Sequence, residues 1–322
     1  MRPALERRNL TVVTGAQVTR VLFDGRRATG VAYRTGDGDH RAPAEREVVL
    51  CGGVVNSPQL LMLSGVGPAE HLRSLGIHLV HDLPGVGGNV QDHLAVPTVV
   101  TAPGVHAPVS ASSVPSLLRL LLLRSGPLTG NASEACAFVR THPQLAAPDV
   151  ELIFAPAASL AAALPSARAR LRGRLGGLRR LADRGRRPPA ATAVTIGAAL
   201  LTPRSAGTIR LRSGDWRDAP AIDPGYLSDP DGHDVQLLAH ATRLAVGVAH
   251  AGGFRLPVGD RRAPPSGPDV DDDALEAWIR DRALTLNHPV GSCRMGTDPM
   301  AVVDPQLRVH GVEHLRVVDA SV

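Results

Sequence analysis

The sequence predicts a mixed α/β fold, and three observations support this prediction. Runs of alternating apolar and polar residues, typical of β-strands, fill residues 9–51. A glycine turn then leads directly into a segment with helix-start signals. Later in the chain, residues 234–249 place Leu, Ala and Val at helical spacing, and strand-like runs return in 195–211 and 302–322. No internal repeat at a fixed period is visible, so we do not expect a solenoid.

The N-terminal region is predicted to be a small meander that feeds a buried strand. Strand-like runs cover residues 10–14, 17–23, 30–33 and 46–51. The dipeptide Asp24-Gly25 follows the second run and is a strong signal for a tight hairpin. We therefore expect consecutive strands that pair with their neighbours in sequence.

Two helices are predicted next. Ser57 is of the type preferred at an N-cap and Pro58 suits the first helical position, so a helix is expected from there to residue 63. A second helix should start at Pro68 and close at Gly76, because glycine is the usual residue after a helix end. A strand-like run at 77–81 follows.

The composition excludes several chemistries. Hydrophobic residues make up 43% of the 322 residues, enough for one or two cores. All basic residues are Arg and none is Lys, so a phosphate-loop lysine, a Schiff-base lysine or a Ser-Lys dyad cannot occur. Neither a G-x-S-x-G elbow nor an H-E-x-x-H helix is present, which argues against serine hydrolases and zinc proteases.

The charge, the cysteines and the hydropathy of the chain limit which binding partners and which cellular compartment we expect. The net charge of +5 comes from an Arg excess, but aromatics are only 2%, too few for a single-stranded nucleic-acid platform, so no nucleic-acid partner is expected. Cys51, Cys136 and Cys293 are odd in number and far apart, which suggests no disulfide framework. With no signal-like opening and no apolar run of spanning length, we expect a cytoplasmic protein without an integral membrane span.

The densest cluster of reactive residue types lies in residues 287–296. Its side chains include His288, Cys293 and Met295, which are soft ligands that a copper ion would accept, although no second His is near. His288 could also be a plain loop histidine, or a general base that takes the proton of a substrate hydroxyl. These residues alone leave all three interpretations open.

Six segments together resemble the glucose-methanol-choline (GMC) oxidoreductase family. Residues 53–68, GVVNSPQLLMLSGVGP, closely resemble its second signature. The other five occur in the family's order and comprise residues 9–12, 88–93, 203–211, the His288 segment and 315–321. The resemblance covers the chain except for an Arg- and Ala-rich stretch at 157–191, and its motifs are specific.

The resemblance implies a fold as well as a family. It implies an incomplete FAD-binding, Rossmann-like α/β domain that is split in sequence, together with a substrate domain based on a β-sheet (α+β). The FAD-binding domain is then expected at residues 1–95 and again at 286–322. The substrate domain is expected at 96–285, with 157–191 as an insertion.

The resemblance also implies an activity and site residues. The implied reaction is FAD-dependent oxidation of an alcohol to an aldehyde or ketone, by hydride transfer to the flavin. His288 matches the active-site histidine that assists removal of the alcohol proton. Val18 resembles the residue whose backbone meets the adenine of FAD, and Asp319 with Ala320 resembles the turn near the flavin. Glu134 lies where choline-oxidising relatives carry a carboxylate that faces a cationic substrate head. Asp92 and His93 resemble a structural turn near the flavin.

Two departures from the family pattern shape the alternatives. No G-x-G-x-x-G follows a strand, and the family's second active-site residue, a His or Asn after the Asp-Ala-Ser motif, has no counterpart. We therefore expect a portion of a family member that lacks the N-terminal FAD-binding segment and the extreme C-terminus. The alternatives are a catalytically incomplete fragment, a partner subunit that needs another chain for FAD binding, or a basic surface-binding module built on 157–191. The electron acceptor, whether oxygen, a quinone or another carrier, is not indicated.

Overall fold

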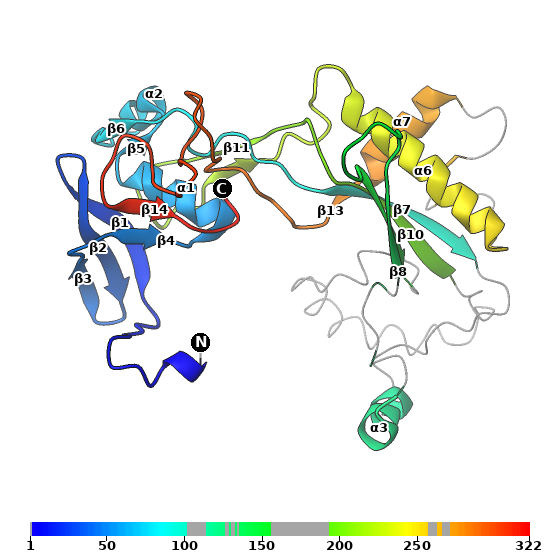
Figure 1. Ribbon diagram of the computed structural model, residues 1–322, viewed down its shortest axis with the longest axis horizontal. Helices are drawn as coiled ribbons and strands as arrows, with labels where there is room; N and C mark the ends of the chain where they lie inside the picture. The colour runs from blue at the N-terminus through cyan, green and yellow to red at the C-terminus, as the bar shows by residue number, and fades with distance from the viewer. Residues whose placement is uncertain are drawn as a thin grey trace, which may run out of the picture. The chain divides into compact units, whose positions relative to one another are not determined.

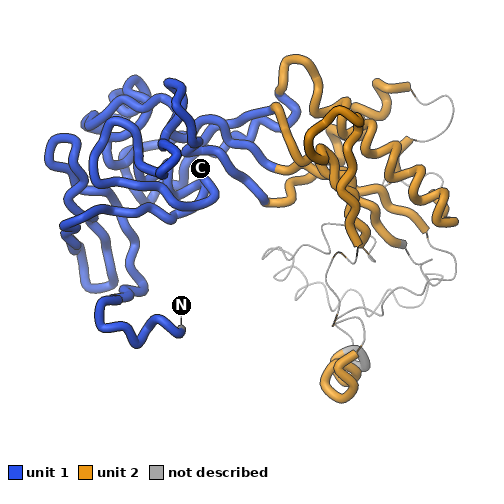
Figure 2. The backbone as a smooth tube through the Cα atoms, viewed as in Figure 1, with its two compact units in different colours: residues 1–92, 205–228, 288–322 blue, residues 93–204, 229–287 orange. Residues whose placement is uncertain are grey.

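The computed structural model describes residues 2–101, 114–125, 129, 133, 135–155, 193–256, 263–265 and 271–322 (Figure 1). The chain divides into two compact units, of which the first comprises Met1–Asp92, Ser205–Ser228 and His288–Val322 (Figure 2). The second comprises His93–Arg204 and Asp229–Asn287. Glu134 and the stretch 157–191 lie outside the described residues.

The first unit begins with a 3-10 turn, η1 (Arg2–Ala4), followed by the predicted meander. Strands β1 (Gln17–Asp24), β2 (Arg27–Thr35) and β3 (Gly38–Pro43) form an antiparallel sheet in that order, which confirms the hairpin at Asp24-Gly25. The predicted strand at 10–14 was wrong. Its side chains Leu10, Val12 and Val13 are exposed, and no described strand pairs with this segment.

A parallel strand pair ties the start of this unit to its end. β4 (Val48–Leu50) pairs in parallel with β14 (Leu315–Val317), with Val48 opposite Leu315. Helix α1 (Gly53–Leu63) follows β4 and buries Leu61 and Met62 in the same core cluster as the two strands. The strand, glycine turn and helix predicted from the sequence are therefore present in that order.

Helix α1 begins earlier than predicted. Gly52 is the N-cap, so Ser57 lies inside the helix instead of capping it, and Pro58 is an internal proline. The physical reason is that Asp319, remote in sequence, provides the hydrogen-bond acceptor at the first turn. A local reading of capping residues could not detect this acceptor.

The remainder of the first unit packs around α1. Helix α2 (Ala69–Ser74) starts after Pro68 and ends before Gly76, as predicted, and β5 (Val66–Gly67) pairs in parallel with β6 (His81–Asp82). β11 (Thr208–Arg210) and β12 (Ala221–Asp223) form an antiparallel pair.

The segment that carries β11 and β12 belongs to the first unit, although it falls within the substrate domain predicted at 96–285. Val90 and Gly207 exchange backbone hydrogen bonds of 3.0 and 2.8 Å, and the N–H of Ile209 donates to the Gly87 carbonyl at 2.6 Å. Ile209 also packs with Val90 and with Val54 of α1. These contacts with the first 92 residues explain the grouping.

The second unit is built on a five-stranded antiparallel sheet of order β13-β7-β10-β9-β8. Helix α6 (His233–Ala251) covers one face of this sheet, and α7 (Asp272–Arg282) packs on α6 (Figure 1). The predicted helix at 234–249 is therefore confirmed. The strands are β7 (Leu94–Thr101), β8 (Ala135–Val139), β9 (Val150–Ala155), β10 (Ala193–Leu200) and β13 (Leu284–Thr285).

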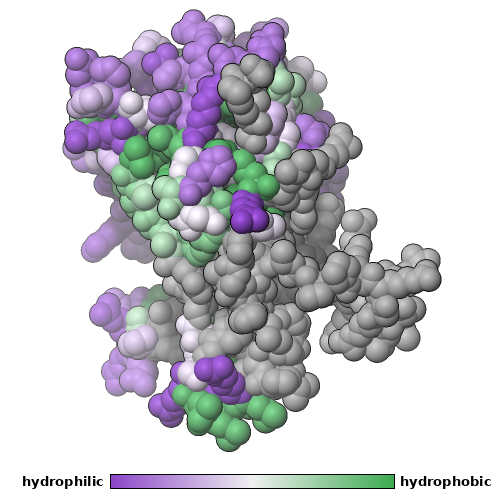
Figure 3. Space-filling model, turned by 90° about the vertical axis from the view of Figure 1, so that its right-hand side faces the viewer, coloured by the Kyte–Doolittle hydropathy of each residue, from purple (hydrophilic) through white to green (hydrophobic). Residues whose placement is uncertain are grey.

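Helix α3 (Val114–Leu123) exposes a group of leucines. Leu117, Leu118, Leu121 and Leu122 are between 49% and 76% exposed, and they form hydrophobic surface at the lower end of Figure 3. None of the described helices is long and apolar enough to cross a bilayer.

Candidate functional site

The first turn of α1 binds the side chain of Asp319, one of the predicted site residues. The Oδ2 atom of Asp319 accepts the backbone N–H of Gly53 at 2.9 Å and the hydroxyl of Ser57 at 2.5 Å, while Oδ1 accepts the N–H of Ser321 at 2.8 Å. The N–H of Gly52 in turn donates to Ser57 Oγ at 3.0 Å. A carboxylate at a helix N-terminus is further stabilised by the helix dipole.

The electrostatics of Asp319 reflect these contacts. Burial alone would raise the pKa of its carboxyl, but hydrogen bonds from Ser321, Ser57 and Gly53 outweigh burial and hold the pKa below its ordinary value. Asp319 is therefore an anion at neutral pH, fixed at the junction between β4 and α1.

A second contact with α1 comes from the loop that carries His288. Pro58 has no N–H, so the carbonyl of Val54, four residues earlier, loses its helical donor. The buried hydroxyl of Ser292 donates to this carbonyl at 2.6 Å. The next residue, Cys293, donates its N–H to the Ser321 carbonyl at 2.6 Å. The His288 loop is thus bonded both to α1 and to the turn of Asp319.

His288 itself is exposed, and its backbone is held by a buried carboxylate. Its N–H donates to Oδ1 of Asp92 at 2.9 Å, and the hydroxyl of Tyr226 donates to Oδ2 of Asp92 at 2.6 Å. Next to this contact, Gln91 and Val290 exchange backbone hydrogen bonds of 3.1 and 2.8 Å. The loop therefore lies along residues 87–92 as an antiparallel bridge.

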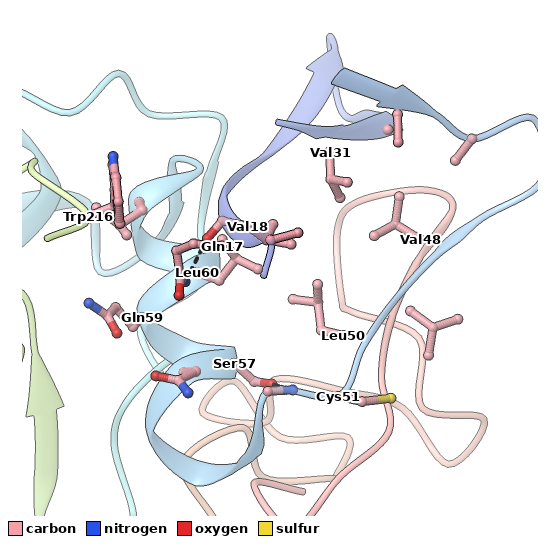
Figure 4. A pocket seen from close by; sticks show the side chains of 18 of the residues that line it. Gln17, Val18, Val31, Val48, Leu50, Cys51, Ser57, Gln59, Leu60 and Trp216 are labelled. Carbon is pink, nitrogen blue, oxygen red and sulfur yellow. Dashed lines mark hydrogen bonds between the residues drawn. The ribbon is translucent and has the colours of Figure 1, made fainter. Parts of the chain in front are cut away.

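Val18 lies in the wall of a cavity beside this junction (Figure 4). The cavity has a volume of about 580 Å³, within the range common for small-molecule sites, and it lies between the meander, β4 and α1. Gly52 and Ser57 line it as well, so the cavity reaches Ser57, whose hydroxyl donates to Asp319. Its walls are largely apolar, with the valines and leucines labelled in Figure 4, and Gln17, Gln59 and Trp216 line it as well.

The structure joins the segments of three predicted site residues to α1 and its N-cap, each at a different point. Val18 lines a cavity together with Gly52 and Ser57, Asp319 binds Gly53 and Ser57, and the His288 loop reaches Val54 through Ser292. Ala320 is exposed next to Asp319. Glu134 lies outside the described residues, so its predicted role stays a prediction.

The copper interpretation of the 287–296 cluster gains no support. Cys293 is completely buried in the hydrophobic core cluster, and burial raises the pKa of its thiol to about 12. Cys293 is therefore a packing residue of the core in this structure. Among the described residues no group of three or more His, Cys, Asp or Glu side chains could hold a metal ion.

The sequence analysis missed the supporting roles of Asp92, Tyr226 and Ser292. Asp92 was seen in a motif but given no chemistry, because its two hydrogen-bond donors follow it by 134 and 196 residues. Ser292 was seen only as a small residue beside His288. The internal Pro58 was the available signal, since a proline inside a helix requires another donor for the carbonyl it leaves unpaired.

This chain is similar to known proteins both in family models and in individual relatives. Two models of the GMC oxidoreductase family match the chain, the N-terminal one at residues 1–95 and the C-terminal one at 203–322. The uncharacterized GMC-type oxidoreductase Mb1310 of Mycobacterium bovis is 44% identical over all of this chain and 57% of its own length. An alcohol dehydrogenase [acceptor] of Pseudomonas putida is 38% identical over 99% of this chain and 54% of its own length. Human mitochondrial choline dehydrogenase is 37% identical over 100% of this chain and 51% of its own length.

Solved structures match the fold over nearly the whole chain. Pyridoxine 4-oxidase from Mesorbium loti matches with a TM-score of 0.76 and 27% identity, over 100% of this chain and 55% of its own. A second match is a formate oxidase variant from Aspergillus oryzae that is described for its FAD modification. It has a TM-score of 0.77 and 25% identity, over 99% of this chain and 57% of its own. The chain thus spans about half the length of the relatives that it matches.

Proposed function

Because the chain belongs to the GMC oxidoreductase family, we propose that it forms part of an FAD-dependent enzyme that oxidises an alcohol to an aldehyde or ketone. The proposal is supported by relatives described as alcohol and choline dehydrogenases and by a structural neighbour described with FAD. These names belong to the relatives, and their activities are extended to this chain as a hypothesis.

One observation carries the proposal, namely the convergence of the His288 loop and the Asp319 turn on the first turn of α1. The two segments come from different parts of the sequence, yet both are bonded to the same helix. Such convergence at the carboxyl end of a parallel strand, here β4, is the usual location of cofactor sites in α/β folds.

The residues present fit a dinucleotide at this junction. The cavity beside Val18 is apolar enough for an adenine ring, and the lining residues Gln17 and Gln59 offer hydrogen-bonding groups. Asp319 and Ala320 would line the turn that approaches the flavin. When bound, FAD supplies the acceptor for the substrate hydride.

The chain's own part in the reaction is the handling of the substrate proton. His288 is exposed on a loop whose backbone is held on both sides, so its imidazole can accept the hydroxyl proton of an alcohol without reorganisation of the loop. Loss of this proton makes the carbinol carbon a better hydride donor. Glu134 would face the cationic head of a choline-like substrate.

A second candidate is a partner subunit or incomplete fragment that receives FAD contacts from another chain. It is favoured by the absence of a G-x-G-x-x-G after any strand in these residues, because that motif normally cradles the pyrophosphate. The two candidates differ in whether FAD binds to this polypeptide alone.

The test is to incubate the purified chain with FAD and follow flavin reduction on addition of an alcohol panel that includes choline. The enzyme proposal expects bound FAD that is reduced by at least one alcohol. His288→Ala should slow reduction by about 10²- to 10⁴-fold without loss of bound FAD. His240→Ala, which removes an exposed histidine from α6, is the matched control and should not change the rate.

Two outcomes would oppose the enzyme proposal for this chain. FAD that binds but is not reduced by any alcohol would contradict it. Failure of the chain to retain FAD, with binding restored by a separate polypeptide carrying the glycine fingerprint, would favour the partner-subunit candidate.

A further inference from the structure

We propose that Asp92, held by Tyr226, is a positioning residue that fixes the orientation of His288. The proposal rests on the function proposed above, in which His288 accepts the substrate proton. It concerns a contact that involves the His288 backbone and is separate from any contact with substrate or FAD.

Asp92 accepts hydrogen bonds from two distant segments of the chain. Its two carboxylate oxygens are used separately, Oδ1 by the N–H of His288 at 2.9 Å and Oδ2 by the hydroxyl of Tyr226 at 2.6 Å. A carboxylate is planar, so two donors on different oxygens fix both its position and its rotation. The peptide that begins His288 is thereby tied to Tyr226 through a single side chain.

The Asp92 carboxylate is also buried. Asp92 is only 8% exposed, and an ionised carboxylate is costly to remove from water unless donors compensate. The N–H of His288 and the hydroxyl of Tyr226 are two donors that compensate in this way. A buried acid that accepts a hydrogen bond from a candidate catalytic loop is well placed to hold that loop in position.

The backbone next to both donors of Asp92 has an unusual conformation. Asn287, immediately before His288, has a φ of 61°, and Leu227, immediately after Tyr226, has a φ of 54°. Non-glycine residues adopt such left-handed values at an energetic cost, so surrounding contacts must enforce them. Pro289 further restricts His288 to extended conformations. The residue immediately before His288 is thus held in a conformation that non-glycine residues seldom adopt.

Gly291 shows how closely the loop fits its support. It has a φ of 85°, and a Cβ placed there would lie 2.5 Å from the carbonyl oxygen of Asn89. The backbone of Gly291 therefore packs directly against Asn89, at an approach that a side chain would block. With Gly291 packed in this way, removal of the Asp92 carboxylate should let the His288 peptide rotate.

The experiment compares three variants in the FAD-loaded chain. Asp92→Asn keeps an acceptor for His288 and can donate to Tyr226, so kcat should fall by at most about tenfold. Asp92→Ala removes both contacts and should lower kcat by roughly 100-fold, the scale expected for a misplaced catalytic group. Tyr226→Phe should lie between them. KM should change little in all three, because Asp92 is not proposed to touch the substrate.

Matched controls are available for each change. Asp149 is a 7% exposed acid in the second unit that also binds one backbone N–H and one hydroxyl, both from Thr141. Asp149→Ala should destabilise the protein comparably without lowering kcat. Tyr33→Phe alters the chain's other tyrosine, which stacks on His40 in the meander, and should leave kcat unchanged.

A second measurement separates this proposal from the proposed function. Amide hydrogen exchange of residues 287–292 should become faster in Asp92→Ala and Tyr226→Phe but not in Asp149→Ala, whether or not any alcohol is oxidised. If the unmodified chain oxidises no alcohol, the proposed function fails while exchange still tests whether Asp92 holds the loop. Unchanged exchange and unchanged kcat in Asp92→Ala, or equal losses of kcat in Asp149→Ala, would overturn the positioning role.

Discussion

Asp319 has its charge at the first turn of α1, where Gly53, Ser57 and Ser321 all donate to it. A group whose pKa is lower in the folded state than in the unfolded chain stabilises the fold above its unfolded pKa. That contribution is lost as the pH falls through the folded pKa. Asp319 should therefore make the first unit sensitive to acid.

The corresponding prediction concerns Asp319→Asn. The free energy of unfolding of the unmodified chain should decrease below about pH 4, the ordinary range for an aspartate, partly because Asp319 becomes protonated. In Asp319→Asn this part of the decrease should be absent, and stability at neutral pH should be lower. Denaturant unfolding at several pH values measures both. Asp231→Asn, an exposed acid in the second unit, is the control, and an identical pH dependence in both variants would contradict the assignment.

At the scale of single elements, α1 depends on groups that lie far from it in sequence. Ser292 provides the donor that Pro58 cannot, and Asp319 provides the acceptor at the first turn. Both contacts join α1 to segments that also carry predicted site residues. Helix α1 therefore holds segments of the candidate site in place and also contributes side chains to the core.

A double-mutant cycle tests the link between Ser292 and Pro58. Ser292→Ala should cost about 1–3 kcal/mol of unfolding free energy, because the buried Val54 carbonyl loses its donor. In a Pro58→Ala background the new N–H can serve that carbonyl, so the cost of Ser292→Ala should fall below about 1 kcal/mol. Thr242→Val in α6 is the control, since its hydroxyl donates to a helical carbonyl that already has a backbone donor. Additive costs in the cycle would refute the coupling.

These elements also show what the sequence could predict. The hairpin at Asp24-Gly25 and the limits of α2 were predicted correctly, because proline, glycine and turn residues act on their immediate neighbours. The start of α1 was missed because its acceptor is Asp319. Residues 10–14 alternate as a strand does, yet a strand also needs a partner, and the described residues provide none.

The candidate site was predicted only in part, for the same physical reason. Val18, His288 and Asp319 were named through the family resemblance, and the structure shows that their segments meet at α1. Asp92 and Tyr226 form a contact that neither residue type nor local spacing could reveal. Hydrogen bonds between distant segments follow from topology, and local patterns do not encode them.

At the scale of the whole chain, the two units have separate cores. Leu315 of β14 is buried in the first, and Leu238 of α6 is buried in the second. The chain crosses between the units four times, so each unit is assembled from separated segments. We expect each core to stabilise mainly its own unit.

Hydrogen exchange on two core variants tests this expectation. Leu315→Ala and Leu238→Ala should each cost about 2–5 kcal/mol, the usual cost of removing a buried leucine side chain. In Leu315→Ala the amides of 1–92 and 288–322 should lose protection, and those of 93–101 and 229–251 should keep it. Leu238→Ala should give the reverse pattern. Equal loss of protection in both units would mean that the chain unfolds as one cooperative body.

The pairing of β4 with β14, and of α1 with Asp319, has a consequence for biosynthesis. Residues 48–63 leave the ribosome long before residues 315–319 are made, and at typical elongation rates the delay is on the order of tens of seconds. During that time β4 lacks its neighbour and the apolar side chains Leu61 and Met62 have no completed core to enter. The nascent polypeptide should therefore be a client of chaperones that bind apolar segments, and its yield in a cell should depend on their supply.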